Sequence, residues 1–469
     1  MRARPPTARS AKAARRPAAS VVTAALPEPF AGWFAAKGWQ PRAHQLALLA
    51  QATARHSTLL IAPTGAGKTL AGFLPSLVAA HTARERPTRG AGLRTLYISP
   101  LKALAVDVAR NLLMPIAEMS LEIRVETRTG DTPQSKRQRQ RLTPPEILLT
   151  TPEQVALLLA SPDAGFLFGD LDTVILDELH ALAPSKRGDL LGLDVARLRT
   201  LAPALMTVGL SATVAHPSEL RAWLTPQTTP ETTIQLADIV TVSGGVAPHI
   251  EILETESGMP IASHTARYAV PEVLAAIARH RLTLVFVNTR MQAEFMFQEL
   301  WKANGDSLPI ALHHGSLDVG QRRKVEAAMA RGELRAVVAT STLDLGIDWG
   351  DVDLVIHLGA PKGASRLIQR IGRANHRLDE PSNAILVPAN RFEVLECRAA
   401  LEAALAGEQD AVIHRRGAVD VLAQHVLGMA CAGPFAADEL FAEVRAALPY
   451  AGLSRAEVTR CAITSVSRA

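Results

Sequence analysis

Short apolar segments separated by helix-length stretches recur along most of the chain, and they limit the folds that it can adopt. The segments are about four to eight residues long and rich in β-branched side chains, as is typical of strands buried on both faces of a parallel sheet. Because strands that alternate with helices form βαβ units, we predict an α/β fold with two tandem domains built on parallel sheets. The first series is TLLIAP, TLYISP, IRVET, EILLTTP, TVILDE and MTVGLSAT, and the second is LTLVFVNT, PIALHHGS, AVVATST, LVIHLGA and AILVPA.

The composition limits the class of protein further. The apolar runs are far shorter than the roughly 18 residues of a membrane-spanning helix, so we expect a soluble protein with no membrane partner. The three cysteines, Cys397, Cys431 and Cys461, are far apart, which disfavours a disulfide framework or metal cluster and fits the reducing cytoplasm. Six basic side chains lie in residues 1–20, which leaves 44 basic against 45 acidic residues elsewhere. Any nucleic-acid site must therefore be local.

Four regions are expected along the chain. Residues 1–25 have the Ala, Arg, Pro and Ser composition of a disordered basic tail, with an organellar transit peptide as the alternative. Residues 26–256 and 257–395 would form the two α/β domains, because the stretch near the boundary contains Gly, Pro and Ser and has no clear period. Residues 396–469 are helical in pattern, and AVDVLAQHVLGMACAG predicts an amphipathic helix that stops at Gly433.

The segment APTGAGKT, residues 62–69, lies between a predicted strand and a helix predicted to begin near Lys68. Two glycines let backbone N–H groups turn toward phosphate oxygens, and the helix N-terminus adds partial positive charge. Lys68 would reach the β- and γ-phosphates of ATP, and the Thr69 hydroxyl would hold Mg²⁺. The general pattern begins with glycine where this chain has Ala62, and a chance GKT sequence is the alternative interpretation. The predicted ATP-binding residues here are Thr64, Gly65, Ala66, Gly67, Lys68 and Thr69.

The segment TVILDELHAL, residues 173–182, ends a buried strand with two adjacent acids. Ligands of parallel sheets bind beyond the carboxyl ends of the strands, so both acids are expected in a catalytic cleft. Asp177 would orient the waters of a nucleotide-bound Mg²⁺, and Glu178 would position or deprotonate the attacking water. Taken alone, the two acids could equally be the solvated start of a helix. The phosphate-binding loop upstream favours the catalytic interpretation.

Further segments follow these two in a fixed order: SPLKALA, TTPEQ, SAT, VFVNTR, ATSTLDLGID and QRIGRANHR. Together they resemble the ordered motifs of superfamily-two DExH helicases. Within that group, GWQPRAHQ, TRTGD, SKRGD, HHGSL, LGIDWGD and VDVLAQHVLGMA resemble the large helicase-related (Lhr-type) family, and the bacterial ligase-associated DExH helicases are the most similar. The likeness runs from about residue 26 to about residue 450.

The resemblance implies a motor of two RecA-like domains that binds ATP in the cleft between them. It assigns Gln45 to the adenine, a contact that a side-chain amide can make with N6 and N7. Gly346 and Asp348 would contact the nucleotide from the second domain. The residues implied in coupling hydrolysis to domain movement are His180, Ser211, Thr213 and Gln369.

Arg373 is the arginine finger that the resemblance implies, and such a residue stabilises charge on the transferring phosphoryl group. Related motifs end in a second arginine three residues later, whereas this chain has His376 followed by Arg377. Either Arg377 or Arg370 would then supply the second finger.

The positions that match nucleic-acid contacts of the family are mostly hydroxyls and isolated cations after predicted strands. Such groups bind phosphate and sugar, so binding should be largely independent of sequence and weakened by salt. The segment SKRQRQR, residues 135–141, could be a further contact patch or simply a solvated helix face. The implied nucleic-acid residues are Ser99, Lys102, Thr151, Pro152, Arg290, Thr340 and Thr342.

The helix after Ala418 resembles the start of a winged-helix domain, and the family continues beyond it, so the chain looks truncated at its C-terminus. The resemblance implies an ATP-dependent helicase or translocase that moves 3′ to 5′ on single-stranded DNA, separates tailed duplexes and acts in DNA repair, with a DNA ligase or nuclease as possible partner. An RNA or RNA–DNA hybrid helicase is one alternative, and a nucleotide-dependent clamp without unwinding is another.

Overall fold

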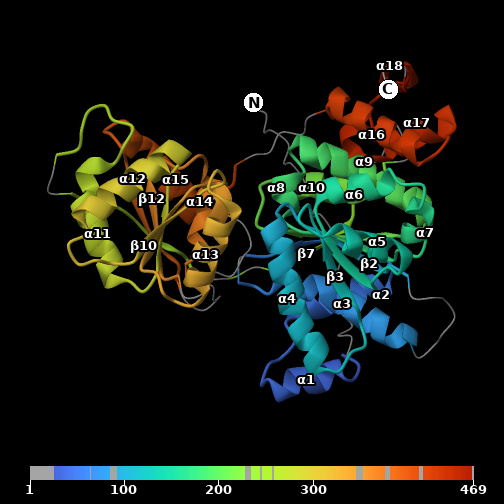
Figure 1. Ribbon diagram of the computed structural model, residues 1–469, viewed down its shortest axis with the longest axis horizontal. Helices are drawn as coiled ribbons and strands as arrows, with labels where there is room; N and C mark the ends of the chain where they lie inside the picture. The colour runs from blue at the N-terminus through green and yellow to red at the C-terminus, as the bar shows by residue number, and fades with distance from the viewer. Residues whose placement is uncertain are drawn as a thin grey trace, which may run out of the picture.

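The computed structural model describes residues 26–63, 65–84, 92–227, 234–242, 244, 246–255, 258–344, 352–374, 381–410 and 416–466. Two lobes lie side by side, and each encloses a parallel sheet (Figure 1). The first lobe is the part built on a sheet of seven strands, and the second lobe is the part built on a sheet of six. The predicted tandem α/β architecture is therefore confirmed. The basic tail predicted for residues 1–25 lies outside the described residues.

The sheet of the first lobe is parallel throughout its described pairs, with the strand that precedes the phosphate-binding loop next to its edge. Five of its strands are buried along their whole length, as expected for a sheet with helices on both faces. In spatial order the strands are β3 (Val125–Arg128), β4 (Ile147–Thr150), β2 (Thr95–Ile98), β5 (Thr173–Leu176), β6 (Met206–Ser211), β1 (Thr58–Ile61) and β7 (Asp238–Thr241).

The sheet of the second lobe is also parallel in all its described pairs. Its spatial order is β10 (Ile310–His313), β11 (Ala336–Ala339), β9 (Thr283–Phe286), β12 (Leu354–Leu358), β13 (Asn383–Val387) and β8 (His249–Ile252).

Helices cover the sheets and form the C-terminal part of the chain. Those of the first lobe are α1 (Phe30–Ala36), α2 (Ala43–Thr53), α3 (Lys68–Arg84), α4 (Lys102–Glu118), α5 (Gln134–Leu142), α6 (Pro152–Leu159), α7 (Ala164–Phe168), α8 (Leu179–Leu182), α9 (Lys186–Leu201) and α10 (Pro217–Trp223). Those of the second lobe are η1 (Arg267–Ala269), α11 (Val270–Arg279), α12 (Arg290–Ala303), α13 (Val319–Ala330), η2 (Ser341–Leu343), α14 (Ala364–Ile371) and α15 (Glu393–Ala406). The C-terminal elements are α16 (Val419–Ala432), α17 (Ala437–Ala446), η3 (Leu448–Tyr450) and α18 (Arg455–Val466).

The boundaries expected around the second domain were misplaced. Strand β8 precedes residue 257 in the sequence, yet it pairs with β13 in the second sheet. Helix α15 extends past residue 395 and packs against α14 and β8 in the second lobe. The first error has a clear cause, because HIEI alternates polar and apolar residues and lacks the continuous apolar run used to find the strands.

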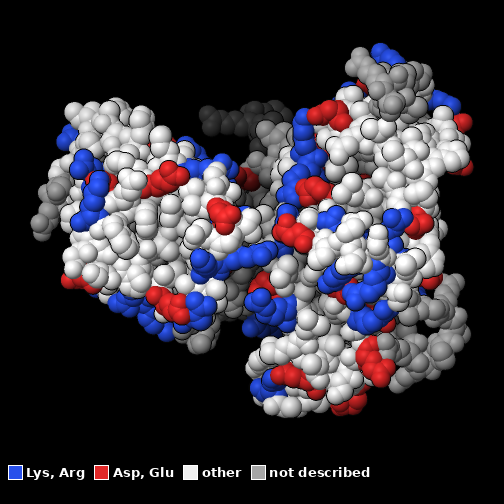
Figure 2. All heavy atoms as spheres, in the orientation of Figure 1, with Lys and Arg blue, Asp and Glu red and all other residues white. Residues whose placement is uncertain are grey.

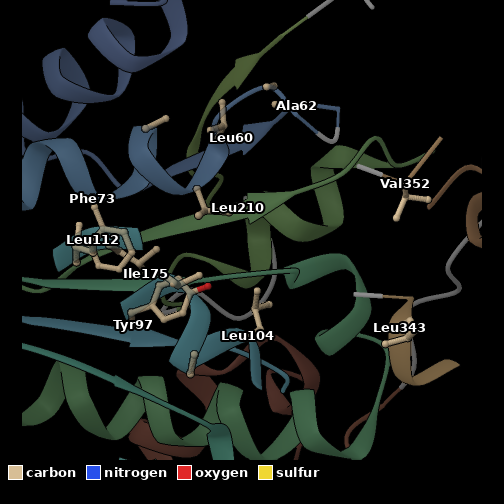
Figure 3. Close-up of a cluster of buried hydrophobic side chains, with 14 of the residues drawn as sticks. Leu60, Ala62, Phe73, Tyr97, Leu104, Leu112, Ile175, Leu210, Leu343 and Val352 are labelled. Carbon is tan, nitrogen blue, oxygen red and sulfur yellow. The ribbon is translucent and has the colours of Figure 1, made fainter. Parts of the chain in front are cut away.

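The apolar core of the first lobe contains a buried tyrosine, Tyr97. Phe73 of α3 stacks on Tyr97 of β2, with ring centroids 5.2 Å apart. Figure 3 shows these two rings beside Ile175 of β5. Tyr97 is fully buried, so its hydroxyl has to find a partner inside the protein.

The C-terminal helices pack against the first lobe. Helix α16 ends at Ala432 just before Gly433, as the sequence predicted. In Figure 1, α16 and α17 lie on α9, and the apolar side chains of the three helices form one cluster that includes Leu193, Val426 and Val444. Among the described residues, no helix combines the length and apolar character needed to cross a membrane.

Candidate nucleotide site and nucleic-acid surface

The phosphate-binding loop joins β1 to α3. Gly65 and Gly67 have φ angles of +77° and +75°, a region that only glycine enters readily. Ala62 replaces the first glycine of the general pattern without disturbing the loop, since its N–H donates to Ser211 O at 3.1 Å and extends the pairing of β1 with β6. The predicted position of the loop between strand and helix and the helix start at Lys68 are confirmed, while Thr64 lies outside the described residues.

Lys68 folds back onto this loop. Its Nζ donates to Ala62 O at 2.9 Å and to Pro63 O at 3.3 Å. Burial lowers the pKa of Lys68, and the nearby acids Glu178 and Asp177 oppose that shift. The ammonium is therefore held among the loop carbonyls and is available for an anionic ligand that offers better hydrogen bonds.

The start of α2 lies against the same loop. Arg42 Nη1 donates to Gly65 O at 3.2 Å, and Arg42 N donates to Gln45 Oε1 at 2.8 Å. A Cβ atom added at Gly67 would lie 3.8 Å from Gln45 Nε2. The structure thus brings Gln45, the predicted adenine contact, beside the loop on a segment far from it in the sequence.

Asp177 follows β5 and is buried. One of its carboxylate oxygens accepts a short hydrogen bond from the Tyr97 hydroxyl, and the other accepts from Glu178 N at 2.9 Å. Burial, together with the charge of Glu178, raises the pKa of Asp177 to about 6. Tyr97 was not identified from the sequence, where it counted only as an aromatic strand residue.

Glu178 is held in a left-handed backbone conformation, with φ of +48° and ψ of +42°. Such a conformation in a residue with a side chain clusters at functional sites. Burial raises the pKa of Glu178, but His180 and the charges of Lys68 and Arg373 outweigh it and lower that pKa below its ordinary value. Glu178 is therefore an ionised carboxylate at neutral pH.

His180 joins the DELH segment to the SAT segment. Its Nδ1 accepts a hydrogen bond from Ala212 N at 3.3 Å, and its Nε2 lies 3.4 Å from Glu178 Oε2. Burial lowers the pKa of His180, so the ring is neutral, with its proton on Nε2 facing Glu178. Ser211 joins this contact, whereas Thr213 is exposed. Two of the three predicted coupling residues of the first lobe are thus brought together.

Arg373 lies just beyond α14 in the second lobe and is buried. Burial has the largest influence on the pKa values of Lys68 and Glu178 in the first lobe: it lowers the pKa of Lys68 and raises that of Glu178. The charge of Arg373 has a smaller influence and lowers both pKa values. The guanidinium of the predicted finger is therefore close enough to Lys68 and Glu178 for its charge to act across the boundary between the lobes. Gly346, Asp348 and Arg377 lie outside the described residues.

Arg370 is committed to the interior of the second lobe. Its Nε donates to Asp344 Oδ1 at 2.8 Å, its Nη1 lies 2.6 Å from His357 Nε2, and its guanidinium lies over the Phe286 ring at 4.6 Å. These contacts contradict the alternative in which Arg370 reaches into the cleft. The neighbouring Gln369 has a buried amide nitrogen without a hydrogen-bond partner among the described residues.

The residues predicted to contact nucleic acid lie at the carboxyl ends of neighbouring strands in each sheet. In the first lobe they follow β2 and β4, and in the second lobe they follow β9 and β11. Figure 2 shows Lys and Arg side chains on both sides of the boundary between the lobes. The first-lobe residues are Ser99, Lys102, Thr151 and Pro152, and the second-lobe residues are Arg290, Thr340 and Thr342.

These residues differ in how accessible their polar groups are. Lys102 Nζ lies 3.1 Å from Asp131 Oδ1, and Arg290 Nη1 donates to Ser316 Oγ at 2.6 Å; both cations are exposed. Ser99, Thr151 and Thr340 are buried, so their contribution to binding would come from the backbone around them.

The basic segment SKRQRQR forms α5, and its cations are engaged within the protein. Arg137 donates to the carbonyl oxygens of residues 129, 130 and 132. Arg139 and Lys136 pair with Glu126, and Arg141 pairs with Asp163. The structure therefore favours a polar helix face over a nucleic-acid patch.

Three family models match successive parts of the chain. The DEAD/DEAH box helicase model matches residues 42–220, and the model of the helicase conserved C-terminal domain matches residues 267–377. The model of the large helicase-related protein winged helix domain matches residues 402–465. Together with the loop of the first lobe and Arg373 of the second lobe, these matches define the class: the helicases with two RecA-like domains.

The relatives narrow that class. The Lhr helicase/uracil glycosylase of Escherichia coli (strain K12) is 36% identical over 488 residues, which cover 92% of this chain and 32% of that protein. The ATP-dependent helicase Lhr-Core protein 2 of Thermococcus barophilus is 36% identical over 445 residues, covering 92% and 51%. The chain belongs to the Lhr-type superfamily-two helicases, as its motifs indicated. It spans about a third to a half of the length of these two relatives.

A solved structure agrees with this assignment. The structure of Mycobacterium smegmatis helicase Lhr bound to ssDNA and AMP-PNP has a TM-score of 0.81 and 34% sequence identity to this chain. The similarity covers 92% of this chain and 56% of the other.

Proposed function

We propose that this chain couples ATP hydrolysis to movement along single-stranded DNA and separates DNA duplexes with 3′ to 5′ polarity. The observation that carries the proposal is the placement of Arg373. The charge of Arg373 in the second lobe lowers the pKa values of Lys68 and Glu178 in the first lobe. A triphosphate bound at the loop would therefore interact with residues of both lobes. Hydrolysis would then change the contact between them.

The residues divide the chemistry among themselves. Lys68 would exchange its loop carbonyls for the β- and γ-phosphates, and Arg373 would stabilise negative charge on the transferring phosphoryl group. Glu178, ionised and fixed by its backbone, would orient the attacking water and accept its proton. His180 donates toward Glu178 and so keeps that carboxylate aligned.

The donor set around Asp177 fits Mg²⁺. A carboxylate and a hydroxyl are the hard oxygen ligands that this ion prefers. Asp177, directly after β5, and Thr69, in the first turn of α3, would supply them. Burial and the charge of Glu178 raise the pKa of the Asp177 carboxylate, and a bound cation would oppose both influences. When bound, Mg²⁺ would neutralise phosphate charge.

The choice of DNA rests on the relatives. The mycobacterial structure holds ssDNA and AMP-PNP, and this chain carries the exposed cations Lys102 and Arg290 beyond the carboxyl ends of strands in the two sheets. Such groups contact the backbone and not the bases, so we expect binding without sequence preference.

The name of the E. coli relative joins a helicase with a uracil glycosylase, which supports a role in DNA repair, with a ligase or nuclease as partner. None of the described cysteines forms a disulfide, which suits the cytoplasm.

The deciding experiment measures strand separation on duplexes with a 3′ tail, a 5′ tail or blunt ends, with and without ATP and Mg²⁺. We expect only the 3′-tailed DNA to be opened, and only with ATP. Lys68→Ala should lower ATP turnover by about 100-fold or more while ssDNA binding persists. Unwinding that survives in Lys68→Ala would refute the assignment.

The same assay separates the other candidate activities. If RNA duplexes or RNA–DNA hybrids are opened faster than DNA duplexes, the substrate is RNA or the hybrid and not DNA. If single strands stimulate hydrolysis but tailed duplexes stay paired, the chain is a nucleotide-dependent clamp.

A further inference from the structure

Helix α14, which leads to Arg373, receives its N-terminal cap from outside the helix. The carboxylate of Asp410 accepts from Ala364 N at 3.2 Å and from Ser365 N at 3.0 Å. In return, Asp410 N donates to Ser365 Oγ at 2.7 Å. A carboxylate that accepts from the first N–H groups of a helix satisfies donors without a partner inside the helix and matches its dipole. Here the capping residue lies in the segment after α15, beyond the second sheet.

The residue before the helix is adapted to this contact. Gly363 has a φ of +104°, and a Cβ atom added there would lie within 2.9 Å of the Asp410 carboxylate carbon. Because no side chain fits between the helix start and the carboxylate, glycine at this position permits the close approach. The cap is therefore a built contact with matched partners on both sides.

The other end of α14 is fixed as well. Arg370 is bonded to Asp344 in the interior of the second lobe, and Leu367 and Ile371 are buried. The helix is thus held near its C-terminus by Arg370 and at its N-terminus by Asp410. Arg373 follows the helix by two residues, so the position of the guanidinium depends on both attachments.

Asp410 also lies where three parts of the molecule meet. It lines a cavity whose other walls include His180 and Val214 of the first lobe and Leu448 and Pro449 of the C-terminal elements. His180 contacts Glu178 and the SAT segment, while Leu448 and Pro449 belong to the region packed on α9. A change in the approach of the lobes or of the C-terminal helices would therefore change the surroundings of Asp410.

We propose that Asp410 is a positioning residue for Arg373: it fixes α14 and transmits the contact between the first lobe, the C-terminal helices and the second lobe to the finger. The proposal rests on the proposed role of Arg373 in ATP hydrolysis. Asp410 itself touches neither the phosphate-binding loop nor the catalytic acids in any contact described above, so its effect should appear in turnover and not in nucleotide affinity.

The test compares Asp410→Ala and Asp410→Asn with the unaltered chain at saturating ssDNA. We expect Asp410→Ala to lower kcat for ATP about five- to tenfold with KM within about twofold, because a displaced finger weakens only the transition state. Asparagine keeps one acceptor oxygen for the helix and should recover most of the loss. Asp306→Ala, at an exposed aspartate of the second lobe, is the matched control and should leave kcat unchanged.

A double-mutant cycle distinguishes positioning from general stability. In the Arg373→Ala background, Asp410→Ala should cause no further loss of turnover, since coupled residues are not additive. An equal loss in both backgrounds, or an unchanged kcat in the single variant, would overturn the proposal. If Arg373→Ala itself keeps full activity, the role of Arg373 fails instead.

Amide hydrogen exchange provides a readout independent of activity. Asp410→Ala should accelerate exchange at Ala364 and Ser365, the two capped amides, while amides of α12 keep their rates. Unchanged exchange at both amides would show that Asp410 does not hold the helix and would also overturn the proposal.

Discussion

The imidazole Nδ1 of His180 lies 3.3 Å from the hydroxyl oxygen of Ser211 and 3.3 Å from the backbone nitrogen of the next residue, Ala212. The other ring nitrogen faces Glu178. A neutral imidazole thus connects the residue proposed to orient the attacking water with the segment that follows β6. A displacement of that segment would move the ring, and with it the hydrogen bond to Glu178.

His180→Ala is therefore expected to separate hydrolysis from movement. We predict that ATP turnover with ssDNA falls by about tenfold and strand separation falls further, because both hydrogen bonds of the ring are lost. Paired ATPase and unwinding assays give the ratio of ATP used to base pairs opened. The control is His216→Ala. His216 is exposed and lines the same cavity as His180 and Asp410. An unchanged ratio in His180→Ala would contradict the coupling role.

Arg373→Ala should lower kcat by about 10³-fold or more, the range found when an arginine finger is removed. The reason is that its guanidinium is needed most when charge develops on the phosphoryl group. Stopped-assay ATPase rates at saturating ATP measure the effect. Arg398→Ala, at an exposed arginine of α15, should be neutral. A tenfold or smaller loss in Arg373→Ala would assign the finger to another residue.

Arg370→Met should lower the free energy of unfolding of the second lobe, and it should not affect ATP hydrolysis directly. Removing this buried guanidinium leaves the Asp344 carboxylate paired only with Arg366, whose Nε lies 3.0 Å from Asp344 Oδ2. The loss of stability should therefore be smaller than the about 3–5 kcal/mol of a completely broken buried ion pair. Urea unfolding followed by circular dichroism measures the change. Adding Asp344→Asn should restore part of the stability. A stable Arg370→Met protein with impaired hydrolysis would instead place Arg370 in the active site.

His425 predicts a pH dependence of stability. The ring lies 3.5 Å from Asp194 Oδ1 and 3.7 Å from Glu443 Oε1, which in turn pairs with Arg197. Burial lowers the pKa of His425, but hydrogen bonds and charges of the two acids outweigh it and raise the pKa to about 9. Because the folded-state pKa exceeds the unfolded value near 6.5, the stabilisation is complete below about pH 6.5 and is lost as the pH rises through about 9.

Thermal unfolding measured from pH 6 to pH 10 tests this expectation. The unaltered chain should lose stability on the order of 3 kcal/mol more than His425→Asn does over this range. His249→Asn, at an exposed histidine of β8, should follow the unaltered chain. If the stability of His425→Asn and of the unaltered chain depends on pH in the same way, His425 is not charged where α16 packs against α9.

Two arginines distinguish the nucleic-acid surface from the polar face of α5. Arg290→Ala should weaken ssDNA binding and reduce the slope of log affinity against log salt by about 0.7, as for one lost phosphate contact. Arg139→Ala should change neither, because Arg139 pairs with Glu126. Fluorescence anisotropy at several salt concentrations measures both. The reverse result would move the binding surface to α5.

The sequence identified the strands that are apolar throughout, because continuous burial leaves a continuous apolar run. It missed β7 and β8, whose exposure alternates residue by residue because each lies at an edge of its sheet. The loop at residues 62–69 and the two acids after β5 could be predicted because the proposed chemistry requires fixed spacing in the sequence. Tyr97 and Asp410 were missed because each acts on a residue distant in the chain, and only the folded structure brings the partners together.

The left-handed backbone of Glu178 has a consequence for how this chain could change over time. A residue with a side chain at such an angle costs about 1–2 kcal/mol relative to one in the helical region, and glycine would remove that penalty. Selection for stability alone would therefore favour glycine or asparagine there. A glutamate at residue 178 is what the proposed role in turnover predicts at a position where folding alone favours glycine.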